Sequence, residues 1–107
     1  LKVILDRNRI QIDDFCEEQM RMFDIPAKWK AFGWNVKEID GHNMNEIMEG
    51  LDFLEAPENC NGPSILIAHT IKGGGISYME NNPSFHGAAP NDEQFHQAMV
   101  ELGEVEA

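Results

Sequence analysis

One short stretch of the chain, residues 63–68, restricts the possible folds more than any other feature. Its sequence is Pro-Ser-Ile-Leu-Ile-Ala, which is apolar at every position after the serine. A strand with one face in water alternates apolar and polar residues, whereas a strand covered on both faces is apolar along its length. We therefore expect residues 63–68 to form a strand that is buried on both faces.

Two more strands and a helix are predicted in the amino-terminal part of the chain. Residues 3–5 form a short apolar run that ends at Asp6, and residues 34–40 alternate in hydrophobicity, so both segments are typical of strands. We expect the first of them to be buried. Between them, Pro26 suits the first turn of a helix and Gly33 suits the position just after its end.

Capping signals mark two further helices. Asn43 with Glu46 and Asn91 with Gln94 both resemble the capping box, in which two side chains bond reciprocally to the backbone at a helix start. Apolar residues recur at helical spacing after each box: Met44, Ile47, Met48, Leu51 and Leu54 after the first, and Phe95, Ala98, Met99 and Leu102, stopped by Gly103, after the second. The full order is strand, helix, strand, helix, strand, long loop, helix. This order predicts the α/β class, with a three-layer parallel sheet and covering helices.

The charge balance narrows the classes of partner. The 107 residues include 19 acidic and 8 basic ones, which gives a formal charge of −11. Nucleic acids and anionic membranes both reward clustered Lys and Arg, so we expect neither as a partner. No apolar run approaches the roughly 20 residues that cross a bilayer, and no secretory signal is apparent. Cys16 and Cys60 are far apart and in no metal-binding spacing, which favours free thiols in a reducing cytoplasm.

The first residues suggest a piece of a longer chain. The sequence opens on Leu1 inside an apolar strand, without an initiator methionine. Three strands taken from a larger sheet leave an exposed edge that invites pairing. We therefore expect this chain to associate with the rest of its domain, to dimerise or to be poorly soluble.

Two loops are candidates for a binding site because each follows a strand, and ligands of parallel α/β sheets bind outside the carboxyl ends of the strands. In the polar loop of residues 7–14, the side-chain oxygen of Asn8 and a nearby main-chain carbonyl are hard ligands that suit Mg²⁺ or Ca²⁺. The alternative is a polar loop in which the asparagine only caps or turns the chain. A short helix within residues 15–23 is expected after this loop.

The second loop, residues 69–75, is rich in glycine. Three glycines after Lys72 leave backbone N–H groups free to approach an anion, and the lysine adds a positive charge for phosphate. The spacing differs from that of a Walker loop, and a flexible loop is an equal alternative. Further along, His86 lies in the irregular stretch of residues 81–90, where a lone histidine is usually exposed and idle. It becomes a candidate for chemistry if it converges with Asn8 and Lys72.

Several stretches taken together resemble the transketolase family. They are LDRNRIQID at residues 5–13, ILIAHTIKGGGISYMENN at 65–82 and FHGAAPNDEQF at 85–95, with AFGWNVKEIDGHN at 31–43 fitting the strand and turn between them. The similarity covers nearly the whole chain in the family's order. It is especially close to split transketolases, in which this domain is a separate subunit. It implies that residues 1–107 are a partial thiamine-diphosphate-binding fold, the carboxyl-terminal half of that domain.

The resemblance also implies a site and a reaction. Asn8 and the carbonyl of Ile10 match the ligands of the metal, Mg²⁺ or Ca²⁺, that holds thiamine diphosphate. Lys72 matches a lysine that contacts the cofactor in part of the family. His86 matches a histidine near the diphosphate and the sugar, which makes it the catalytic candidate. The implied activity is transfer of a two-carbon ketol unit between sugar phosphates, in the cytoplasmic pentose phosphate pathway, by a homo- or hetero-oligomer with a pyrimidine-binding domain or subunit.

Departures from the family pattern keep other interpretations open. The sequence has no GDG motif, which carries a further metal ligand in the family, and Asp14 stands where the family often has glycine. The pyrimidine-binding domain is also missing, so the chain by itself is expected to be inactive. One alternative is another thiamine-diphosphate enzyme, such as a deoxyxylulose-phosphate synthase or a dehydrogenase E1 component. The other is a truncated interaction module without catalysis.

Overall fold

The computed structural model describes residues 1–105, and the chain divides into two compact units. The first unit contains residues 1–8 and 22–70, and the second contains residues 9–21 and the described residues from 71 onward. Within the described part of the chain, no helix has the length and apolar character needed to cross a membrane. Each unit is considered separately below.

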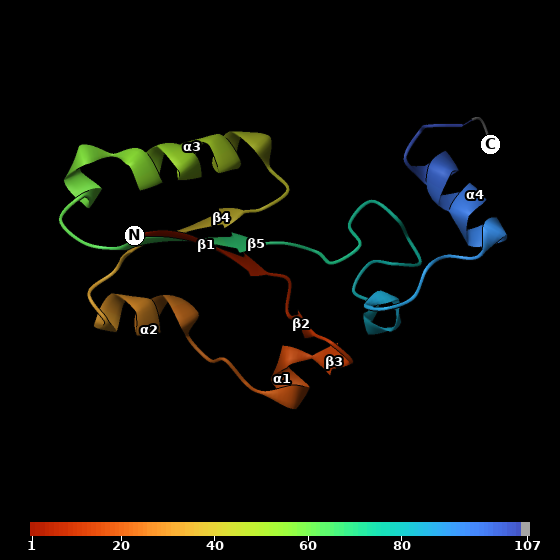
Figure 1. The fold of residues 1–107 in the computed structure, drawn as a ribbon, viewed down its shortest axis with the longest axis horizontal. Helices are drawn as coiled ribbons and strands as arrows, with labels where there is room; N and C mark the ends of the chain where they lie inside the picture. Colours follow the sequence, from red (N-terminus) through yellow and green to blue (C-terminus); the bar gives the residue numbers. More distant parts are fainter. Residues whose placement is uncertain (106–107) are drawn as a thin grey trace. The chain divides into compact units, whose positions relative to one another are not determined.

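The first unit is a parallel sheet with a helix on each face (Figure 1). Its strands β1 (Lys2–Arg7), β4 (Asn35–Asp40) and β5 (Ser64–His69) are arranged in the order β1-β5-β4. The chain therefore passes over the position of β5 to form β4 and then returns. Because parallel connections are right-handed, reversing the direction of travel moves the connecting helix to the other face. Accordingly, α2 (Ile25–Ala31) and α3 (Met44–Glu55) lie on opposite faces.

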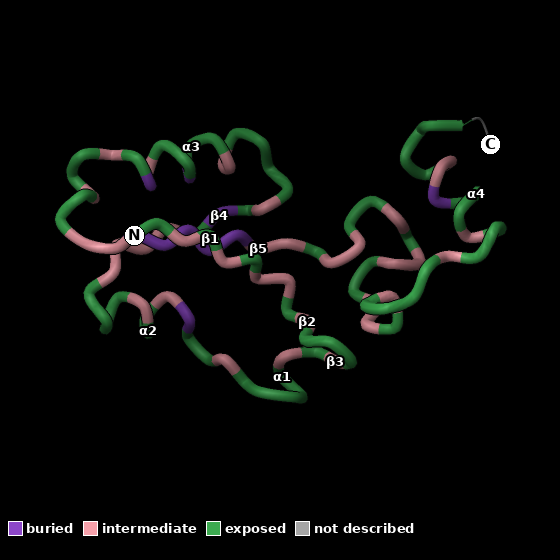
Figure 2. The backbone as a smooth tube through the Cα atoms, in the orientation of Figure 1, coloured by how far each residue is buried: buried purple, intermediate pink, exposed green. Residues whose placement is uncertain are grey.

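Strand β5 is the core of this unit, and the prediction that it is buried on both faces is confirmed. Ile65, Leu66 and Ile67 are 0%, 1% and 0% exposed (Figure 2). Leu66 packs with Leu54 in the layer of α3, whereas Ile65 and Ile67 pack with Ile25 in the layer of α2. The predicted three-layer α/β architecture therefore follows from one strand that sends apolar side chains to both sides.

Strand β1 forms where it was predicted, but the expectation that it is buried is wrong. Its burial alternates along the strand, and Ile4 is 57% exposed. In the sheet, β1 pairs with β5 along one edge. The apolar run of residues 3–5 therefore does not distinguish an edge strand from a strand with two neighbours.

Helix α2 begins and ends as predicted. Asp24 is the N-cap, and its carboxylate accepts a hydrogen bond of 2.8 Å from the backbone N–H of Ala27. Pro26 lies in the first turn, where its missing N–H costs nothing. Gly33, just beyond the end, has φ of +80°, a conformation that glycine adopts without strain.

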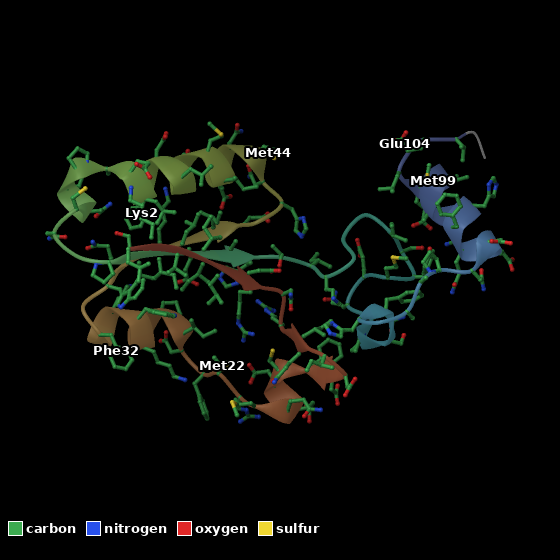
Figure 3. All side chains as sticks on the ribbon, in the orientation of Figure 1. Lys2, Met22, Phe32, Met44, Met99 and Glu104 are labelled. Atoms are coloured by element: carbon green, nitrogen blue, oxygen red, sulfur yellow. The ribbon has the colours of Figure 1, made fainter. Side chains whose placement is uncertain are left out.

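Helix α3 departs from prediction in its cap and in its buried face. The Asn43 side chain caps the Asn45 and Glu46 N–H groups, but the Glu46 carboxylate accepts from the Asp40 N–H at 2.7 Å. Of the predicted apolar stripe, Leu54 is buried, whereas Met44, Met48 and Leu51 are 69%, 57% and 40% exposed (Figure 3). The helix instead approaches β5 through Gly50, where an added Cβ would lie 2.8 Å from Leu66 Cδ1. A short 3₁₀ turn, η1 (Pro57–Asn59), then leads towards β5.

The second unit consists of short elements joined by turns. Residues 7–14 were expected to form a loop, but the structure has a small antiparallel hairpin there, followed by a helix of four residues: β2 (Ile10–Gln11), β3 (Asp14–Phe15) and α1 (Cys16–Gln19). Ile12 at the turn has φ of +53°, and Asp14 pairs with Gln11 in the hairpin. The later elements are the 3₁₀ turn η2 (Pro83–Phe85) and α4 (Asp92–Glu101).

Helix α4 confirms the second capping box. The Asn91 side chain accepts from the Gln94 N–H at 2.9 Å, and the Gln94 side chain accepts from the Asn91 N–H at 3.0 Å. Gly103, with φ of +74°, ends the helix as predicted. Of the predicted apolar stripe, Ala98 is buried, whereas Phe95 is 57% exposed.

Candidate functional site

The carboxyl ends of the three parallel strands are level with one another. Arg7 of β1 and Asp40 of β4 are both in register with His69 of β5. Polar side chains gather at this edge, which is where parallel α/β sheets bind ligands. Asn8, the predicted metal ligand, follows directly after β1.

Asn8 belongs to a hydrogen-bonded group with Asp6 and Thr70. The Asn8 Nδ2 atom donates to Asp6 Oδ2 at 3.3 Å, and the Thr70 hydroxyl donates to Asp6 Oδ1. The Thr70 N–H also approaches the Arg7 carbonyl at 3.5 Å. Each carboxylate oxygen of Asp6 therefore accepts one of these two hydrogen bonds, one from its own end of the chain and one from the residue after β5.

Gly41 allows the chain to turn tightly beside Thr70. Its N–H donates to the His69 carbonyl at 2.8 Å, and an added Cβ would lie 2.5 Å from Thr70 Cγ2. The Asp40 carboxylate accepts from the His42 N–H at 2.9 Å and so closes the same turn. Glycine at this position leaves room for the threonine methyl group.

His69 forms a cross-strand pair with Glu38. Its Nε2 atom lies 2.8 Å from Glu38 Oε2. The Nδ1 atom is buried and has no hydrogen-bond partner within the described residues. His69 is thus a structural histidine on one nitrogen only, and its partner Glu38 was not singled out by the sequence analysis.

The glycine-rich loop is folded into turns, and the prediction of available backbone donors is wrong for two of its glycines. The Gly74 N–H donates to the Ile71 carbonyl at 3.0 Å, and the Gly75 N–H donates to Glu80 Oε1 at 3.0 Å. Gly73 has φ of +74° and Gly75 has φ of +96°. The glycines therefore serve the path of the backbone, because side chains strain such conformations. Lys72 is half-buried, and its carbonyl accepts from the Asn81 N–H at 3.0 Å.

Helix α4 anchors this loop through polar contacts. The Glu101 carboxylate accepts from the Ser77 N–H and hydroxyl, both at 2.6 Å, and from Gln97 Nε2 at 2.7 Å. These hydrogen bonds, led by the Ser77 hydroxyl, lower the pKa of Glu101. The Tyr78 hydroxyl donates to the Gln94 carbonyl at 2.7 Å. Two consecutive loop residues are therefore tied to one helix.

His86 is exposed at the end of η2. Its N–H donates to the Pro83 carbonyl at 2.9 Å, and the ring of the preceding Phe85 lies 5.3 Å from that of Tyr78. The Asn82 side chain caps the turn by accepting from the Ser84 N–H at 3.2 Å. The turn that carries His86 is thus connected, through Tyr78, to α4.

The predicted site residues divide between the two units. Asn8 is in the first, whereas Ile10, Lys72 and His86 are in the second. Asn8 offers an amide oxygen and Ile10 a main-chain carbonyl, which are the oxygen donors that suit Mg²⁺ or Ca²⁺. Within residues 1–105, no group of three or more His, Cys, Asp or Glu side chains is arranged to hold a metal.

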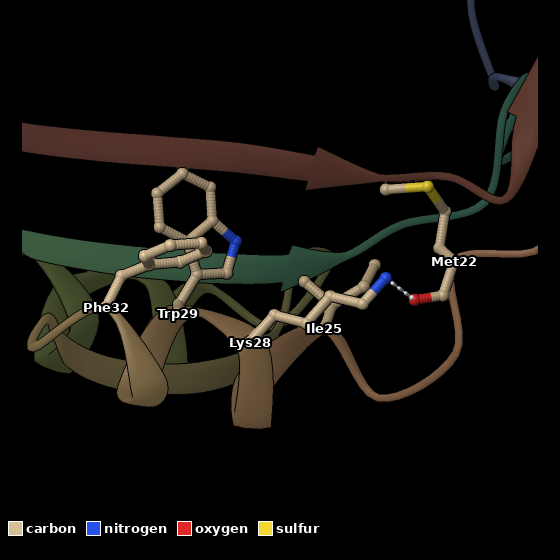
Figure 4. Close-up of a pocket in the computed structure, with 5 residues that line it drawn as sticks. All are labelled: Met22, Ile25, Lys28, Trp29 and Phe32. Atoms are coloured by element: carbon tan, nitrogen blue, oxygen red, sulfur yellow. Dashed lines mark hydrogen bonds between the residues drawn. The ribbon is translucent and has the colours of Figure 1, made fainter.

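A separate apolar hollow lies on the outer side of α2. It has a volume of about 200 Å³, and its lining residues are Met22, Ile25, Lys28, Trp29 and Phe32 (Figure 4). The Lys28 ammonium group donates to the Met22 carbonyl at 2.7 Å. The hollow therefore lacks the donor chemistry of a diphosphate site.

Comparison with known proteins identifies the family. Residues 1–106 match the family described as "Transketolase, thiamine diphosphate binding domain". The chain is 39% identical over 104 residues to one of the subunits of the apulose-4-phosphate transketolase of Phocaeicola vulgatus, which spans 97% of this chain and 36% of that protein. It is 36% identical over 97 residues to "6-deoxy-6-sulfo-D-fructose transketolase subunit SqwG" of a Clostridium species, spanning 91% and 34%.

Solved structures agree with this assignment. The transketolase of Campylobacter jejuni superposes with a TM-score of 0.82 at 25% identity, over 96% of this chain and 16% of that one. The chain thus spans roughly a third of the length of the two bacterial subunits and a smaller share of this solved transketolase. The resemblance stated from the sequence is confirmed, as is the parallel α/β fold.

Proposed function

Because the chain belongs to the transketolase family through its thiamine-diphosphate-binding domain, we propose that it supplies part of the metal and diphosphate site of a transketolase. The complete enzyme transfers a two-carbon ketol unit between sugar phosphates. The observation that carries this proposal is the position of Asn8 directly after the carboxyl end of β1, with its amide hydrogen-bonded to Asp6. This is the edge at which parallel sheets bind ligands.

Each proposed site residue has a role that suits its chemistry. Asn8 and the carbonyl of Ile10 bind Mg²⁺ or Ca²⁺, which neutralises the diphosphate. The ammonium group of Lys72 contacts the cofactor as a compact positive charge. His86 is the catalytic residue, because an imidazole near the sugar donates to substrate oxygens and exchanges protons near neutral pH. Thiamine diphosphate, when bound, supplies the electron sink for breaking a bond next to a carbonyl.

The names of the relatives support a divided enzyme. Two relatives in bacteria are called transketolase subunits, and the names of both include a sugar derivative that carries an anionic group. We propose that this chain works in a hetero-oligomer with a pyrimidine-binding subunit on phosphorylated sugars, within the pentose phosphate pathway. The cytoplasm is the proposed location, and the free thiols of Cys16 and Cys60 are consistent with it.

The proposal is tested by completing the enzyme. The chain is joined to the amino-terminal residues of its transketolase relatives and mixed with a pyrimidine-binding subunit, Mg²⁺ and thiamine diphosphate. We expect ketol transfer to appear, Asn8→Ala to lower kcat/KM at least about 100-fold, and His86→Ala to lower kcat about 100-fold. His96→Ala is the matched control, because His96 is an exposed histidine of α4, and it is expected to change little.

The possible results separate the alternatives. Full activity of the Asn8→Ala, His86→Ala double variant refutes the residue roles. Activity on a 2-oxo acid, with none on ketose phosphates, favours a synthase or dehydrogenase instead. A completed enzyme that pairs with its partner but turns over no substrate favours an interaction module.

A further inference from the structure

Asp6 was not a predicted site residue, yet its carboxylate determines how Asn8 is held. A carboxylate only accepts hydrogen bonds, so both of its partners must donate. The Asn8 side chain therefore turns its Nδ2 atom towards Asp6, at 3.3 Å from Oδ2. Its Oδ1 atom lies at the other end of the same planar amide group. The direction of the ligand oxygen is thus fixed by the position of the Asp6 carboxylate.

Thr70 in turn holds Asp6. Its hydroxyl donates to Asp6 Oδ1, the oxygen that Asn8 does not use. Threonine is stiff about χ1, because two heavy atoms branch from its Cβ. The Thr70 methyl group occupies the space that a side chain on Gly41 would need, with Cγ2 only 2.5 Å from the position of an added Cβ. With the methyl group in that space, the hydroxyl group points to Asp6.

Sheet pairing fixes this arrangement in space. Thr70 follows β5, Asp6 lies in β1 and Gly41 follows β4, and these three strands are neighbours in the sheet. Asp6 is itself exposed, so its hydrogen bonds are not needed to compensate for burial. Three strands therefore contribute to the orientation of one exposed amide, which is more than a simple loop cap requires.

We infer that Asp6 and Thr70 are positioning residues that orient the Asn8 amide for its metal. The inference rests on the proposed function, since it takes Asn8 to be a metal ligand. Partners that orient a metal ligand typically change metal affinity 10- to 100-fold when they are removed. Neither residue touches the cofactor in this assignment, because both act through Asn8.

The first experiment measures the Asn8 side chain itself in this chain, without cofactor. Three-bond NMR couplings about χ1 and the side-chain amide signals of Asn8 are compared in the parent, Asp6→Ala, Thr70→Val and Thr70→Ser. We expect one rotamer in the parent and in Thr70→Ser, which keeps the hydroxyl. Averaged couplings are expected in Asp6→Ala and in Thr70→Val, whose side chain has nearly the same shape but cannot donate. The amide signals of buried Ile65 and Leu66 verify that each variant is folded.

Unchanged Asn8 couplings in Asp6→Ala overturn the inference, whatever happens to activity. The second experiment titrates Mg²⁺ and thiamine diphosphate into the completed enzyme by calorimetry. Asp6→Ala and Thr70→Val are expected to weaken metal-dependent binding about 10-fold or more, and Thr70→Ser to retain it. Parent-like affinity in both weakened variants also overturns the inference. If Asn8→Ala binds as tightly as the parent, the proposed metal role of Asn8 fails instead, and the couplings identify that case separately.

Discussion

The two units of the chain are stabilised in different ways. In the first, β5 is packed between two helices, and every buried apolar residue of residues 1–105 except Ala98 belongs to this unit. In the second, short turns are connected by hydrogen bonds from exposed polar groups, such as those that Glu101 accepts. Apolar burial contributes free energy over an area, whereas such turns depend on single atoms. The candidate site draws residues from both kinds of structure.

The largest effect is expected in the core of the first unit. Leu66→Ala removes a side chain that is 1% exposed and leaves a cavity, so it should lower the free energy of unfolding by about 3 kcal/mol. Urea denaturation followed by tryptophan fluorescence measures the change. Leu51→Ala is the matched control, because Leu51 of α3 is 40% exposed and should cost much less. Equal losses in the two variants would contradict the assignment of the core.

A smaller and more local effect is expected in the second unit. Gly73 has φ of +74°, and an added Cβ would lie 2.6 Å from the Met79 carbonyl oxygen. Gly73→Ala should therefore destabilise the loop by about 1–3 kcal/mol. Hydrogen exchange should accelerate at the Asn81 amide and remain slow at the Leu66 amide. Gly87→Ala is the control, since nothing lies within 4 Å of a Cβ there, and similar exchange in both variants would show that the turn is not strained.

The smallest effect is a dependence on pH. The pKa of Glu101 is lowered by hydrogen bonds from Ser77 and Gln97, so the folded loop favours the ionised carboxylate. Its contribution is therefore present above the usual pKa range of glutamate and is lost as pH falls through the lowered value. Exchange at the Ser77 amide should accelerate in that acidic range for the parent, and Glu101→Gln should remove this step. Glu104→Gln removes the same charge nearby, and a step that persists in Glu101→Gln would assign the titration to another group.

Much of the fold could be predicted because its signals are local. The apolar run of β5 and the capping box of α4 each lie within a few consecutive residues, and both predictions are confirmed. The face of α3 was predicted wrongly because the closest approach to β5 is at Gly50, which has no side chain and gives no hydrophobic signal. Likewise, Glu46 has the spacing of a capping box but bonds to Asp40, outside the helix.

The site was predictable only in part. The resemblance to transketolases supplied Asn8, Ile10, Lys72 and His86, and their roles stay predictions. The group around Asp6 could not be found by spacing, because Asp6 and Thr70 are far apart in sequence and meet only when β1 pairs with β5. The engagement of the glycine N–H groups in turns was also hidden, because glycine is equally typical of anion-binding loops and of tight turns.

The place of β5 in the strand order has a consequence for synthesis on the ribosome. Within the described sheet, β1 and β4 both pair with β5 and not with each other, and β5 is the last of the three to be made. A nascent chain that has released β1 and β4 therefore has two strands without their partner, and such unpaired edges are prone to wrong association. Residue 69 must leave the exit tunnel before both pairings are complete. The sheet is then expected to form in one late step that joins distant parts of the sequence, a slow class of folding event.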